Sequence, residues 1–149
     1  MKIITGVAIG LMALFIAILM SGCHLGSSTK GSSEMSYNKL IGELKSSGYK
    51  IDEIELTENE TKYTFFSVYP QFVDINGQRI SVYEFPDKNT AVSQAETISK
   101  DGFTIGNTKI DWIDKPHFYK QGRLIVGYAG SDNEILNNLK KVLGEPITE

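Results

Sequence analysis

The chain has 149 residues, with 15 Lys or Arg against 18 Asp or Glu and a formal net charge of −3. An acidic chain lacks the basic surface that binds a phosphate backbone, which argues against a nucleic-acid partner. A single cysteine excludes both an internal disulfide and a cysteine-rich metal site.

An apolar segment opens the chain. Lys2 is followed by Ile3 to Met20, which is apolar except for Thr5 and two glycines. This length lies between the core of a secretory signal peptide and a short transmembrane helix. The following stretch, Leu19-Met20-Ser21-Gly22-Cys23, resembles the lipobox that the bacterial lipoprotein signal peptidase reads. We therefore predict a signal peptide over residues 1–22 and a diacylglyceryl group on Cys23, the alternative being an uncleaved anchor helix.

Lipidation predicts a location at the cell membrane, on its extracytoplasmic face. Two acyl chains anchor a protein stably where one chain is marginal. Loss of Lys2 leaves 14 basic against 18 acidic residues, so the lipid and not a basic surface would hold the mature chain at the membrane. Whether this is a plasma or an outer membrane stays open.

A Ser- and Gly-rich stretch, HLGSSTKGSSEM, follows the cysteine over residues 24–35. It predicts a flexible linker with a root-mean-square span of roughly 20 Å. With Cys23 it forms a tether over residues 23–35, and residues 36–149 then form one domain, long enough for a single core.

Start and stop signals predict three helices in this domain. Ser131 and the glutamate three residues later match a capping box. The predicted start and end signals are Ser36 and Gly48 for the first helix, Asp87 and Gly102 for the second, and Ser131 and Gly144 for the third.

The segment QFVDINGQRISVYEF predicts a β-hairpin, because Asn76-Gly77 is the preferred central pair of a type I′ turn. That turn pairs Val73 with Ile80 on the apolar side. It also places Asp74 opposite Arg79, a pair we interpret as solvated and not as a site.

A second hairpin is predicted in HFYKQGRLIVGYAG, turning at Gln121-Gly122, and KIDWI before it alternates like a further strand. The stretch YKIDEIELTENE predicts an early strand. Together these elements predict an α+β fold, a two-layer sandwich of an antiparallel sheet of about four or five strands with helices mainly on one face.

Several of these segments resemble a family of small bacterial lipoproteins of no known activity. The resemblance is carried by FFSV, INGQRISVYEF, IGNTKIDWI, PHFYKQGRLIVGYAG and VLGEP, over roughly residues 37–146. It implies the same architecture and lipid anchor and transfers no active site.

One stretch, DWIDKPHFYKQGR, gathers side chains that carry chemistry. In a hydrolase, His117 would act as a general base oriented by Asp111 or Asp114, with a serine from elsewhere. In a binding module, the surface would comprise Trp112, His117, Tyr119 and Arg123, residue types that supply many binding hot spots. In a purely structural role, the aromatic residues pack in the sheet and His117 bonds at a hairpin end.

We therefore expect a non-enzymatic binding or regulatory lipoprotein, with a protein of the envelope as its partner and no cofactor or metal. The alternatives are a small envelope hydrolase and an accessory lipoprotein of the exclusion or immunity type.

Overall fold

The computed structural model describes residues 34–57 and 64–149, which belong to one unit of the chain. In chain order the elements are α1 (Tyr37–Ser46), β1 (Ile51–Ile54), β2 (Gln71–Ile75), β3 (Gln78–Glu84), α2 (Lys88–Ala95), β4 (Thr104–Ile105), β5 (Thr108–Lys109), β6 (Pro116–Gln121), β7 (Leu124–Ala129) and α3 (Asn133–Leu143). None of the helices in these ranges is long and apolar enough to cross a membrane. The predicted signal peptide, lipobox and most of the tether lie outside the described residues.

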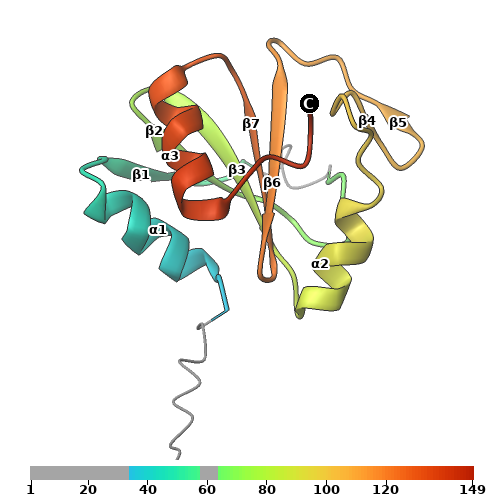
Figure 1. The fold of residues 1–149 in the computed structure, drawn as a ribbon, viewed down its shortest axis with the longest axis horizontal. Helices are drawn as coiled ribbons and strands as arrows, with labels where there is room; N and C mark the ends of the chain where they lie inside the picture. Colours follow the sequence, from blue (N-terminus) through green and yellow to red (C-terminus); the bar gives the residue numbers. More distant parts are fainter. Residues whose placement is uncertain (1–33, 58–63) are drawn as a thin grey trace, which may run out of the picture. The chain divides into compact units, whose positions relative to one another are not determined.

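Five strands form an antiparallel sheet in the order β1-β2-β3-β7-β6 (Figure 1). The β2–β3 hairpin has the predicted register, with Val73 opposite Ile80. Asn76 and Gly77 both have positive φ, 55° and 80°, as a type I′ turn requires. The early strand is β1, although its predicted segment also extends into residues outside the described ranges.

One face of the sheet carries the larger core, over which α1 and α3 pack (Figure 1). Alternate residues of the strands point to this face, and the apolar stripes of the two helices cover them. The fully buried members from the sheet are Val73, Ile80, Val82, Leu124 and Val126, and those from the helices are Leu40 and Leu139. The predicted α+β architecture with a five-stranded antiparallel sheet is thus confirmed.

The opposite face is covered over only part of its area. Tyr83 and Ile125 from the sheet pack there with Ala91 of α2, Phe66 and Phe85. Burial raises the pKa of the Tyr83 phenol to about 12, so this side chain stays neutral. The sheet therefore has a second, smaller core on this face, under α2. The other two helices, α1 and α3, cover the first face.

Two predictions about strands were wrong. KIDWI does not add a strand to the large sheet: only Lys109 is in a strand, β5, which pairs with β4 in a separate two-stranded sheet. The second hairpin turns one residue later than predicted, because Gln121 pairs with Leu124 and leaves Gly122-Arg123 as the turn. Gly122 has φ of 56°, and a glycine at the first central position is typical of a type II′ turn.

The helix boundaries also differ in part from prediction. Asp87 caps α2 as expected, its carboxylate accepting from the Thr90 N–H at 2.9 Å. This helix ends at Ala95, well before Gly102, because Ile98 forms a β-bridge with Ile105.

Neither predicted serine caps its helix. The Ser36 side chain makes no capping bond at α1. Asp132 caps α3 by accepting from the Glu134 and Ile135 N–H groups at 2.8 and 3.2 Å. A carboxylate at this position also interacts favourably with the positive end of the helix dipole.

Met35 belongs to the domain and not to the predicted tether. Its side chain is 9% exposed and lies in the larger core. A Cβ on Gly122 would come within 2.7 Å of the Met35 backbone nitrogen, so the chain enters the domain beside the β6–β7 turn.

The last residues of the chain cover the open edge of β6. The Ile147 N–H donates to the Phe118 carbonyl at 2.7 Å, and the Thr148 hydroxyl accepts from the Phe118 N–H at 3.0 Å. An exposed edge strand invites pairing with another chain, and this segment blocks it. Pro116, with no N–H to donate, occupies the first position of the same edge strand.

We predict that Thr148→Val destabilises the domain by about 1–3 kcal/mol, because it leaves the buried Phe118 N–H without an acceptor. Urea unfolding followed by far-UV circular dichroism measures the change. Thr148→Ser retains the hydroxyl and should lose much less. Equal losses in the two variants would contradict the hydrogen bond to Phe118 as the source of this stability.

Candidate functional site

The open part of the second sheet face is organised by one row of residues across four strands. The strand registers place Phe72, Ser81, Gly127 and Phe118 side by side on β2, β3, β7 and β6. Three strand spacings of about 4.8 Å each put the outer two backbones about 14 Å apart. Large aromatic residues thus stand at both ends of the row, with two of the smallest residue types between them.

Gly127 cannot be replaced by a larger residue without disturbing this row. A Cβ there would lie 2.7 Å from the Ser81 Oγ and 3.0 Å from the Phe118 Cε1. The Ser81 hydroxyl donates to the Gly127 carbonyl at 3.1 Å, so it lies against the sheet and satisfies its own polar atom there. The two residues form a low floor.

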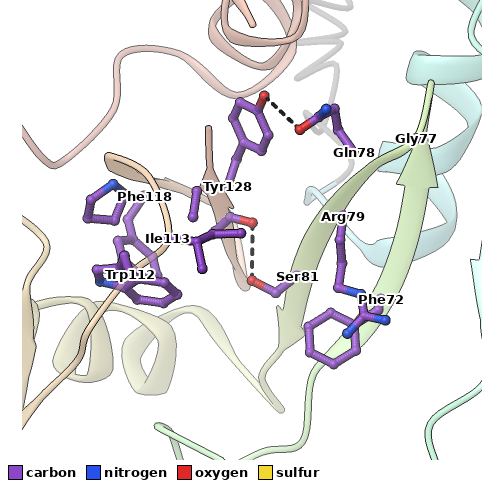
Figure 2. A pocket seen from close by; sticks show the side chains of 12 residues that line it. Phe72, Gly77, Gln78, Arg79, Ser81, Trp112, Ile113, Phe118 and Tyr128 are labelled. Atoms are coloured by element: carbon purple, nitrogen blue, oxygen red, sulfur yellow. Dashed lines mark hydrogen bonds between the residues drawn. The ribbon is translucent and has the colours of Figure 1, made fainter. Parts of the chain in front are cut away.

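The result is a groove of about 490 Å³ over β3 and β7, here called the Gly127 groove (Figure 2). Its lining includes Phe72, Arg79, Ser81, Trp112, Ile113 and Phe118. This volume lies within the range of small-molecule sites, which are concave and mostly apolar with a few polar groups.

One wall is an aromatic cluster around Trp112. The indole makes edge contacts with Phe65 and Phe118, at ring-centroid distances of 5.9 and 5.8 Å. Its Nε1–H donates to the Gly102 carbonyl at 2.9 Å, which fixes the ring orientation. Ile113 continues this wall and is 98% exposed, an unusual position for a large aliphatic side chain.

The facing wall consists of Phe72 and Arg79, which come from β2 and β3 (Figure 2). The Arg79 guanidinium lies over the Phe72 ring, 5.1 Å from its centroid, a cation–π contact. Asp74, the predicted partner of Arg79, accepts from the Gly77 N–H at 2.7 Å. Among the described lining residues of the groove, Arg79 is the one with a charged side chain.

The four residues expected to form a binding surface are not brought together. Trp112 lines the groove, whereas Tyr119 is 1% exposed in the core of the other sheet face. His117 also points to that other face, where it stacks on Tyr128 at 6.4 Å. Arg123 lies in the β6–β7 turn, at the end of the hairpin remote from His117.

Arg123 has a structural contact instead. Its guanidinium donates to the Glu84 Oε1 at 2.8 Å, and the same oxygen accepts from the Tyr37 N–H at 3.1 Å. Glu84 thereby satisfies the first turn of α1, where Ser36 does not. This three-residue contact holds the start of the domain against the sheet.

The hydrolase arrangement requires a serine that donates to the histidine. Instead the Ser131 hydroxyl donates to the Asp114 carboxylate at 3.2 Å, and the same carboxylate accepts from the Lys115 N–H at 2.6 Å. Asp111 is exposed and comes directly before Trp112 in the sequence. Burial lowers the pKa of His117, and the positive charge of Lys115 lowers it further. The Gly130 backbone and Asp114 raise this pKa, but the net shift is downward, so the imidazole is neutral at pH 7. A neutral histidine can act as a base, but no hydroxyl within residues 34–57 and 64–149 donates to it.

No group of three or more His, Cys, Asp or Glu within the described ranges is placed to hold a metal ion. The groove residues that the sequence did not indicate are Phe72, Arg79, Ser81, Ile113, Phe118 and Gly127. Small residues inside an apolar strand were the available signal: Gly127 in LIVGYA stands within a run of larger residues.

We predict that acid destabilises the domain through His117. Because its folded pKa is lowered, the unfolded chain binds the proton more readily. Stability should fall as pH drops below the ordinary histidine pKa of 6.5, and His117→Gln should flatten that fall. Melting temperatures between pH 7.5 and 5.5 measure it, a range above the titration of ordinary carboxylates. Identical slopes for the two proteins would contradict the assignment.

Comparison with protein-family models, with curated proteins and with solved structures gave no match. The resemblance to small bacterial lipoproteins stays a prediction, and the geometry of the Gly127 groove is the basis for a functional proposal.

Proposed function

We propose that this protein is a lipid-anchored, extracytoplasmic binding module and that the Gly127 groove is its binding site. The observation that carries the proposal is the hollow of about 490 Å³ over the row Phe72–Ser81–Gly127–Phe118. An antiparallel sheet can leave one of its faces open to solvent. This one is covered at the α2 end and left open at the other.

The position of the groove fits an anchored protein. The chain enters the domain at Met35, beside Gly122 and close to the contact between Glu84 and Arg123. The groove lies over the opposite ends of β3, β6 and β7, next to Gly77, Pro116 and Ala129. An anchor upstream of residue 34 would therefore leave the groove at the end of the domain remote from its attachment.

The shape favours a small ligand over a protein partner. A stable protein interface buries about 800 Å² on each side and is broad, whereas the groove is a confined hollow of about 490 Å³. No observation in the described residues favours the hydrolase, since the Ser131 hydroxyl is engaged by Asp114.

The anchor is tested by Cys23→Ser. We expect this variant to lose incorporation of radiolabelled palmitate and to leave the membrane fraction or accumulate as precursor. The domain should keep its far-UV circular dichroism, since Cys23 precedes all described residues. Retained palmitate labelling would contradict lipidation at this cysteine.

The groove is tested with 1-octanol, a neutral eight-carbon probe. Trp112 is the single tryptophan of the chain and lines the groove, so its fluorescence reports occupancy directly. The full chain, purified from membranes and placed in lipid nanodiscs, should show a saturable fluorescence change on titration. Nanodiscs with free N-acetyl-tryptophanamide give the background.

Ser81→Leu should weaken octanol binding about tenfold or more, because the new side chain fills the floor of the groove. Ser93→Leu is the matched control, since Ser93 is exposed on α2 and outside the groove. Circular dichroism verifies that both variants fold. A linear, non-saturating signal, or equal effects of the two substitutions, would overturn the groove as a binding site.

A further inference from the structure

We infer that the ligand of the Gly127 groove is a single-chain amphiphile. Its hydrocarbon tail lies along β3 and β7 and ends at Tyr83, and its polar head stays in water beside Gly77. This inference rests on the proposed function and adds the chemical class and the orientation of the ligand. It follows from the change in burial along the groove and from the strands that form its floor.

The groove is closed at one end and open at the other. On the groove face of β3, Tyr83 is 3% exposed, Ser81 is half-buried and Arg79 is exposed. On β7, Ile125 pairs with Tyr83 and is fully buried, whereas Ala129 at the other end is partly exposed. A ligand in the groove therefore meets the second core at one end and water at the other.

The polar side chains toward the closed end bond within the protein. The Ser81 hydroxyl donates to the Gly127 carbonyl at 3.1 Å, and Ser81 is also the side-chain hydrogen-bond partner of the Tyr83 phenol. The Trp112 Nε1–H donates to the Gly102 carbonyl at 2.9 Å. A polar ligand group placed here would lose its water without gaining a partner, which costs free energy. The part of the ligand that enters this end is therefore hydrocarbon.

The floor of the groove is also unsuited to a peptide strand. It is formed by β3 and β7, and each of these strands has a hydrogen-bonded neighbour on both sides. A peptide that binds by strand addition needs the unpaired backbone groups of a sheet edge. A ligand on this floor is therefore held by apolar contact.

The open end carries polar groups. Asp74 accepts from the Gly77 N–H at 2.7 Å, and Asp114 accepts from the hydroxyl of Ser131, just after the end of β7, at 3.2 Å. A polar head can stay hydrated beside these groups. Between Gly77 and Ser81 the floor runs along β3 for about 13 Å, which is long enough for one extended hydrocarbon tail.

The tail is tested with 1-hexanol, 1-octanol, 1-decanol and 1-dodecanol. Trp112 fluorescence of the full chain in nanodiscs gives each dissociation constant, referred to the free aqueous concentration of the alcohol measured by gas chromatography. Affinity should rise about fourfold for each added methylene up to decanol. Dodecanol should gain little more, because its chain projects beyond a floor of about 13 Å. Partitioning into lipid keeps increasing over this series, so the levelling-off distinguishes the groove from the bilayer.

The orientation is tested with a diol that has a hydroxyl at each end of an eight-carbon chain. Whichever end enters the groove, a hydroxyl reaches the closed end at Tyr83 and loses its water. We therefore expect the diol to bind about tenfold or more weakly than octanol.

Ser81→Leu shortens the floor from its closed end, so its affinities should stop rising at hexanol. Ser93→Leu, on α2 and outside the groove, should keep the wild-type profile. Octanol binding that Ser81→Leu weakens, but without this dependence on chain length or with equal affinity for the diol, would overturn the single-chain amphiphile and leave the binding module intact. Saturable binding of none of the alcohols would overturn both.

Discussion

The pairing of β3 with β7 is the contact on which the rest of this structure depends. It joins two locally formed hairpins, β2–β3 and β6–β7, into one sheet with Val82 opposite Val126. The same register aligns Ser81 with Gly127 on the other face. One long-range pairing therefore builds the larger core on one side and the floor of the groove on the other, and a slip of one residue would exchange the two faces.

The sequence predicts the local parts of this arrangement well. Asn76-Gly77 determines its own turn, and with it the pairing of Phe72 with Ser81. The helices were found because apolar stripes and glycine stops are local signals, although tertiary contacts changed their ends. Asp132 caps α3 because Ser131 bonds to Asp114, a residue distant in sequence. Whether Ser131 or Asp132 caps the helix therefore depends on Asp114, which only the folded chain brings close.

The groove was not predictable in the same way, because it has no local signature. Its row is completed by Gly127 and Phe118, which meet Ser81 only through the β3–β7 pairing. The grouping of Trp112 with His117 and Tyr119 was an inference from closeness in sequence. In a strand, neighbouring side chains alternate between faces. Here that alternation sends Phe118 to the second core beside the groove and Tyr119 to the larger core.

Gly127 is small because the Ser81 hydroxyl and the Phe118 ring occupy the space where its side chain would stand. Ser81 lines the open part of the groove, and a larger apolar residue at this position would bury more surface, since each buried methylene contributes about 0.8 kcal/mol. The chain instead holds Trp112 upright with a hydrogen bond and leaves Ile113 98% exposed beside the hollow. Elsewhere on the same face, Tyr83 and Ile125 are covered by α2 and Phe66. The domain thus closes this face at the end near Met35, where the chain enters the domain. The opening at the other end is a local property of the groove residues. A ligand bound there would complete the second core.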